Sequence, residues 1–170
     1  MRIVGASALL LLAAAPAAAQ VNVKFSANSR NGVCYFGVFG GNAPGTDKPM
    51  ELEFSYRVRD GNMGAVIKVN GWDRVQKADP EAKYPMTVVF DTGRTNPSRS
   101  GGYSSGFEDT IWGGWGPGEL SSPLLELMRT GKTARVEVDG MKLGPFDLQM
   151  KSLGHTSLTD CAERVRAGKE

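Results

Sequence analysis

The sequence is poor in the residues that most often carry metal and acid–base chemistry. It contains one histidine, His155, and two cysteines, Cys34 and Cys161. Zinc and copper sites are usually built from several histidine and cysteine side chains. We therefore expect no metal site and no cofactor, and we expect His155 to be a solvated turn residue just ahead of a helix.

Neither sign of charge dominates the chain. It has 20 lysines and arginines against 18 acidic residues, which gives a formal net charge of +2. Acidic and basic residues alternate along the sequence, so it lacks the basic stripe with which proteins neutralise phosphates. We expect no nucleic-acid partner.

Long hydrophobic runs are also lacking, except for one at the start. Residues 3–15 are apolar, follow a single basic residue, Arg2, and precede three alanines at 17–19. This pattern is typical of a secretory signal peptide cleaved before Gln20, and the run is shorter than the about 20 residues of a membrane span. We predict a signal peptide over 1–19 and a single β domain over 20–170, with no membrane span. We expect a periplasmic or secreted location.

The two cysteines lie far apart in the sequence. In an oxidising compartment such a pair indicates a disulfide rather than a metal or redox site. We predict a Cys34–Cys161 bond that joins the beginning of the domain to its end.

Alternating hydrophobicity indicates that the chain is mainly β. The clearest case is 51–59, where every second residue is apolar, followed by a turn at 60–62 and a second alternating run. Capping residues predict two short helices, one after Ser121 and one opened by Ser157 and Asp160. The predicted strands are 21–25, 34–39, 51–59, 65–72, 86–91, 133–138 and 141–150. We expect an antiparallel β-sandwich or flattened barrel of about seven or eight strands with two short helices.

Residues 94–118 have a different composition, rich in glycine, serine and proline. We predict a long loop here, with a short strand around Ile111 as an option. Two tryptophans lie among its glycines, and they either form a binding surface or plug one end of the core. The candidate binding residues are Trp112, Trp115, Tyr103, Phe107, Arg94 and Arg99.

Three further features resemble fragments of catalytic or phosphate-binding sites. The G-x-S-x-G pattern at 102–106 lacks the buried strand and the helix that a hydrolase serine requires. The fragment 131–133 is interpreted as a helix C-cap and not as a phosphate-binding loop. The adjacent acids Glu108 and Asp109 are the only carboxylates that we consider for hydrolysis.

The C-terminal half resembles the invasion-associated locus B family of bacterial periplasmic proteins. The similarity lies in 124–138 (LLELMRTGKTARVEV), 144–154 (GPFDLQMKSLG), 156–158 (TSL) ahead of Cys161, and 88–93 (VVFDTG). This resemblance implies a secreted β-sandwich without a cofactor, acting in the envelope or at the host interface. It supplies no catalytic residues.

These features favour a non-enzymatic, exported binding or interaction protein whose partner is a protein or an envelope component. One alternative is a periplasmic inhibitor of a protease or lysozyme that inserts a rigid loop. The other is a small hydrolase that uses the loop carboxylates. The oligomeric state stays open.

Overall fold

The computed structural model describes residues 29–70, 72, 75, 84–117, 122–148 and 151–169. The predicted signal peptide and the strand predicted over 21–25 lie outside these residues.

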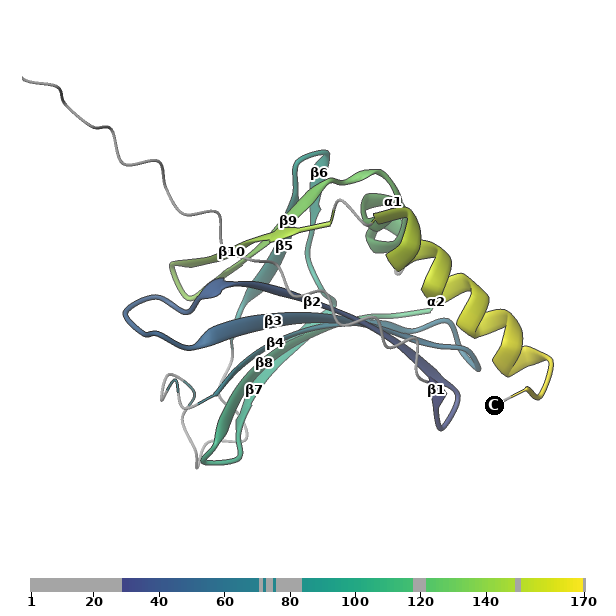
Figure 1. The fold of residues 1–170 in the computed structure, drawn as a ribbon, viewed down its shortest axis with the longest axis horizontal. Helices are drawn as coiled ribbons and strands as arrows, with labels where there is room; N and C mark the ends of the chain where they lie inside the picture. The colour runs from purple at the N-terminus through teal and green to yellow at the C-terminus, as the bar shows by residue number, and fades with distance from the viewer. Residues whose placement is uncertain are drawn as a thin grey trace, which may run out of the picture.

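The chain is mainly β, with ten strands in two antiparallel sheets and two helices among the described residues (Figure 1). The large sheet has the order β1 (Ser29–Arg30), β2 (Val33–Asn42), β3 (Pro49–Arg57), β4 (Met63–Asn70), β8 (Glu108–Trp115) and β7 (Arg99–Ser104). The small sheet has the order β10 (Met141–Asp147), β9 (Thr133–Val138), β5 (Met86–Phe90) and β6 (Gly93–Thr95). The helices are α1 (Ser122–Thr130) and α2 (Lys151–Arg166). The predicted antiparallel sandwich is confirmed, and its sheets stay open instead of closing into a barrel.

One face of each sheet lies in the core between them. Along β4 the apolar residues Met63, Ala65, Ile67 and Val69 are buried, and the residues between them are only partly so. This is the period-two pattern expected of a strand with one solvated face. In Figure 1 the large sheet crosses the middle of the molecule, with the small sheet above it and α2 beside it. The opposite face of the large sheet carries the partly buried residues of the alternation, such as Val66 and Lys68 of β4.

The segment 94–118 is not a long loop, so that prediction was wrong, whereas the optional strand around Ile111 is present as β8. Of its described residues, 94–117, the first two belong to β6, and β7 and β8 form a hairpin at one edge of the large sheet. Glycines occur here because bulky neighbours lie over them: a Cβ on Gly101 would lie 2.8 Å from Cζ2 of Trp112, and one on Gly113 would lie 2.9 Å from Cγ of Pro97. A composition typical of loops thus reflects close packing within strands.

The predicted disulfide is confirmed. Cys34 in β2 and Cys161 in α2 are bonded, lie 127 residues apart in the sequence and are both completely buried. Leu158 and Ala162 of α2 are buried beside the bond, and Val165 is partly buried. The apolar face of this helix therefore carries the disulfide into the core.

The helix α2 begins at Lys151, earlier than the capping residues Ser157 and Asp160 predicted. His155 accordingly lies within a helix and not in a turn. Nucleation is the costly step of helix formation, whereas each further residue adds a hydrogen bond. A helix held to the core through Cys161 can therefore extend toward its N-terminus past a capping sequence.

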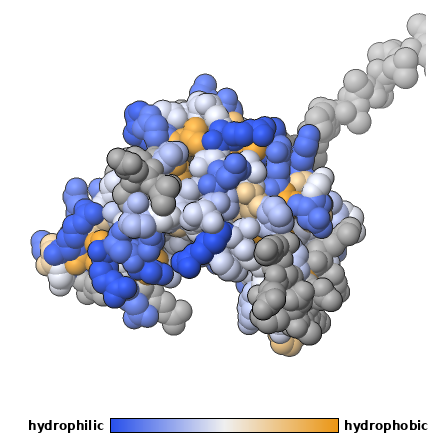
Figure 2. Space-filling view, turned by 180° about the vertical axis from the view of Figure 1, so that it is seen from behind, coloured by the Kyte–Doolittle hydropathy of each residue, from blue (hydrophilic) through white to orange (hydrophobic). Residues whose placement is uncertain are grey.

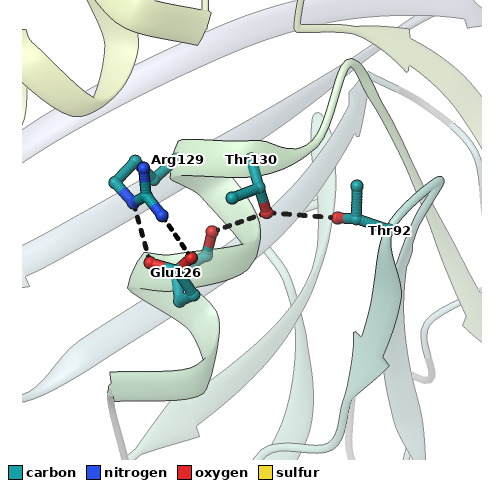
Figure 3. A network of polar contacts seen from close by, with 4 residues as sticks. All are labelled: Thr92, Glu126, Arg129 and Thr130. Atoms are coloured by element: carbon teal, nitrogen blue, oxygen red, sulfur yellow. Dashed lines mark hydrogen bonds and ion pairs between the residues drawn. The ribbon is translucent and has the colours of Figure 1, made fainter.

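The end of α1 is fastened to the turn between β5 and β6 (Figure 3). The Thr130 hydroxyl donates to the Glu126 carbonyl at 2.9 Å and lies 3.3 Å from the Thr92 hydroxyl. The Arg129 guanidinium binds the Glu126 carboxylate one turn back, with Nε to Oε2 at 2.7 Å. These contacts fix the helix against the small sheet.

The Asp91 carboxylate joins the same turn to the start of β9. It accepts the backbone N–H groups of Lys132 at 2.7 Å and Thr133 at 3.3 Å. The hydrogen bond from Lys132 is the largest cause that lowers the pKa of Asp91. Gly131 lies just before this pair and donates to the Leu127 carbonyl at 2.8 Å, as expected of a residue that ends a helix.

Within the part of the chain that the structure describes, no helix is both long enough and apolar enough to cross a bilayer.

Candidate functional site

Strand register places a row of small residues across the solvent face of the large sheet. Ser55 of β3 lies opposite Gly64 of β4, Gly64 opposite Gly114 of β8, and Gly114 opposite Arg99 of β7. Directly opposed residues of a sheet share a face, so the row has a floor of one serine and two glycines and ends at an arginine. We call it the trough.

Larger side chains flank this floor. Trp112 and Val66 lie on one side of the trough and Arg57 and Asn62 on the other, and these residues and the floor are among those that line an open cleft of about 520 Å³. The molecule is hollowed on the side of the large sheet that faces away from the small sheet (Figure 2). A cleft of this volume falls within the range of small-molecule sites.

Trp112 is held in place by its neighbour on β7. Its indole packs against the backbone of Gly101, the residue directly opposite in the register. The side chain is only partly buried. An aromatic ring that is fixed on one side and partly exposed on the other suits stacking against a flat ligand.

The charged groups of the solvent face differ in how well they are neutralised. Lys68 pairs with Glu53 at 2.7 Å, and Arg57 pairs with Asp60 at 3.2 Å. Arg99 extends across Gly114, where a Cβ would lie 3.5 Å from its Nε. Its side chain makes no ion pair or hydrogen bond with any residue that the structure describes. The trough therefore ends in an unneutralised guanidinium.

Comparisons with models of known families, with characterised proteins and with solved structures found no match.

The two tryptophans that the sequence treats alike lie on opposite faces of β8. Trp115 is 3 % exposed, and its Nε1 donates to the Thr95 hydroxyl of the small sheet at 3.0 Å. The plug interpretation therefore describes Trp115, whereas Trp112 faces the solvent. Successive side chains of a strand point to opposite faces of the sheet. Two residues three positions apart, such as Trp112 and Trp115, therefore lie on opposite faces.

The remaining candidates are spread over the molecule. Arg99 lies beside Trp112, and Tyr103 is on the same face further along β7. Phe107 is at the tip of the β7–β8 hairpin, and Arg94 is exposed on β6 of the small sheet. The structure thus brings Trp112 and Arg99 together and leaves Arg94 elsewhere.

Sequence reasoning missed the trough residues that come from β3 and β4. Alternation along these strands does indicate that Ser55, Arg57, Gly64 and Val66 face away from the core. Which of them lie beside Trp112 depends on the pairing of β4 with β8, two strands that 37 residues of chain separate, and this pairing has no local signal in the sequence.

The candidate catalytic groups do not converge. Glu108 faces the solvent, whereas Asp109 is 3 % exposed and accepts the backbone N–H of Val75 at 3.3 Å. Ser104 ends β7 and is followed by a turn into β8, without the helix that a nucleophilic serine of this motif requires. Among the described residues no cluster of three or more His, Cys, Asp or Glu side chains could hold a metal ion.

Proposed function

We propose that this protein is a non-enzymatic binding protein exported to the bacterial envelope, and that the trough is its binding site. The observation that carries the proposal is the unneutralised Arg99 guanidinium beside the Trp112 indole, above a floor without bulky side chains. The signal-like N-terminus and the resemblance to the invasion-associated locus B family support the location, periplasmic or secreted. The buried disulfide is consistent with an oxidising compartment.

The geometry of the trough also indicates which chemical groups its ligand would carry. A planar or apolar ring, from a sugar or an aromatic group, would stack on the indole, and glycines let such a ring approach the sheet closely. A carboxylate or phosphate on the same ligand would bind Arg99, because a guanidinium presents paired N–H donors to such groups. A charge-assisted hydrogen bond contributes about 1.5–3 kcal/mol, so losing Arg99 is expected to weaken binding about tenfold or more.

The test is a screen of small sugar acids and aromatic carboxylates against the isotope-labelled, oxidised protein by NMR. We expect the fragments that bind to shift the Trp112 indole and the amides of Gly64 and Gly114. Arg99→Ala should weaken binding about tenfold or more and so strongly reduce these shifts at a fixed fragment concentration, whereas Arg94→Ala, which removes an exposed arginine from the other sheet, should leave them unchanged. Fragments that bind elsewhere, or equal effects of the two variants, would refute the assignment of the site.

A further inference from the structure

The tip of the β7–β8 hairpin presents an aromatic side chain to solvent. Phe107 is 86 % exposed and Tyr103 is 60 % exposed, and they are the exposed large hydrophobic residues of the described chain. Single exposed hydrophobic residues are common on protein surfaces, so the case for an interaction here depends on how the tip holds Phe107 and on which surface would fit it.

The tip holds Phe107 in such a position. The Ser105 hydroxyl oxygen accepts the backbone N–H groups of Phe107 at 3.3 Å and Glu108 at 3.0 Å, and the Ser105 N–H donates to the Glu108 carbonyl at 3.0 Å. Gly106 supplies the positive φ of +90° that the turn needs. Because the turn is already ordered, docking would lose little conformational entropy.

The chemistry of the tip favours a protein pocket over a membrane. Residues 103–109 contain no lysine or arginine, and binding to anionic lipid needs basic groups or more apolar area than one phenyl ring. The partner should offer an aromatic surface for Phe107 and a cation for the carboxylate of Glu108.

The trough of this same protein offers both groups. Trp112 provides a partly exposed indole and Arg99 an unneutralised guanidinium. The tip cannot reach the trough of its own chain, because Glu108 and Gly114 lie at opposite ends of β8, about 20 Å apart at the rise of a strand. We propose that the hairpin tip of one copy docks in the trough of a second copy, an inference that rests on the trough being the binding site.

Such a contact joins two different surfaces, so it leads from copy to copy in a chain or ring and not to a symmetric dimer. A single hairpin tip in a single trough is a small contact, and interfaces below about 1,200 Å² are typical of transient complexes. We therefore expect reversible self-association that increases with protein concentration. A ligand that binds in the trough should compete with this self-association.

The experiment is sedimentation equilibrium of the oxidised exported chain from micromolar to millimolar concentration. Wild-type protein should show an average mass that rises with concentration. Phe107→Ser, which lacks the tip contact, and Arg99→Glu, which lacks the trough contact, should each stay monomeric. An equimolar mixture of the two should form a one-to-one dimer and nothing larger, because only one complementary pair of surfaces remains.

The control variant is Arg94→Glu, which makes the same charge reversal outside the trough and should associate like the wild type. Native folding of every variant is checked by circular dichroism. A wild-type protein that stays monomeric throughout, or association that persists in Phe107→Ser, overturns the inference. If trough fragments still bind to a protein that stays monomeric, the proposed function stands and the self-association fails; if neither is seen, both fail.

Discussion

Removing the disulfide is the perturbation whose effect can be worked out most directly. Replacing Cys34 and Cys161 by alanine opens a loop of 127 residues in the unfolded chain. For a loop of this length, the chain-entropy relation predicts that the bond raises the free energy of unfolding by about 5 kcal/mol at 25 °C. Since a domain is stable by only about 5–15 kcal/mol, the variant should lose a third or more of its stability.

The assay is urea unfolding followed by circular dichroism and by tryptophan fluorescence. With an m-value of about 2 kcal/mol per molar, the midpoint should fall by about 2.5 M. Wild-type protein reduced with a phosphine should behave like the double variant, because it loses the cross-link while keeping both side chains. Agreement between the two would assign the effect to the bond and not to the missing sulfur atoms.

Two results would refute this reasoning. A loss below about 1 kcal/mol would mean that the unfolded chain is already restricted, so that the loop closes at little cost. A transition in which helical signal is lost before the sheet signal would mean that α2 separates alone. In that case the bond holds one helix to β2 and does not stabilise the domain as a unit.

Three further predictions concern single side chains. Thr95→Val removes the acceptor of the Trp115 indole and leaves a buried N–H unpaired, so it should destabilise the protein by about 1–3 kcal/mol in urea unfolding. Asp91→Asn should destabilise the protein at neutral pH, because a lowered pKa means that the folded state favours the carboxylate. That contribution is present above the unfolded pKa of about 4 and is lost as pH falls through the folded pKa. Gly101→Ala should displace the trough indole and weaken fragment binding, whereas Gly41→Ala, with open space around its Cβ, should not.

Each of these has its own contrary outcome. An unchanged midpoint for Thr95→Val would show that the indole finds another acceptor. A stability gap between wild type and Asp91→Asn that stays constant down to strongly acidic pH would contradict the role of the ionised carboxylate. Equal fragment affinities for the two glycine variants would mean that the indole position is irrelevant to the site.

The parts of the fold that could be predicted are those specified by local patterns. The hairpin of β3 and β4 has its signal within one segment, and so does the helix ended by Gly131. The β7–β8 hairpin was missed because its glycines make room for bulky side chains of neighbouring strands, and the sequence alone does not show which strands are neighbours. Trp112 over Gly101 is the clearest example.

The candidate site shows the same division. Trp112 and Arg99 were named as candidates from residue type and from the glycine-rich composition around them, together with residues that lie elsewhere on the molecule. Trp115 lies in the same glycine-rich segment, yet the alternation of β8 places its side chain in the core. The floor residue Gly64 could not be found, because its place beside Gly114 is set by the long-range pairing of two strands.

The position of the disulfide also bears on how the protein matures. A chain that emerges from its N-terminal end exposes Cys34 early, and its partner appears only 127 residues later. In an oxidising compartment the early thiol can react while most of the sheet is still missing. A protein with two cysteines has a single intramolecular pairing, so scrambled isomers cannot form. The available error is a bond between two chains, and the local concentration of newly made chains decides how often it occurs.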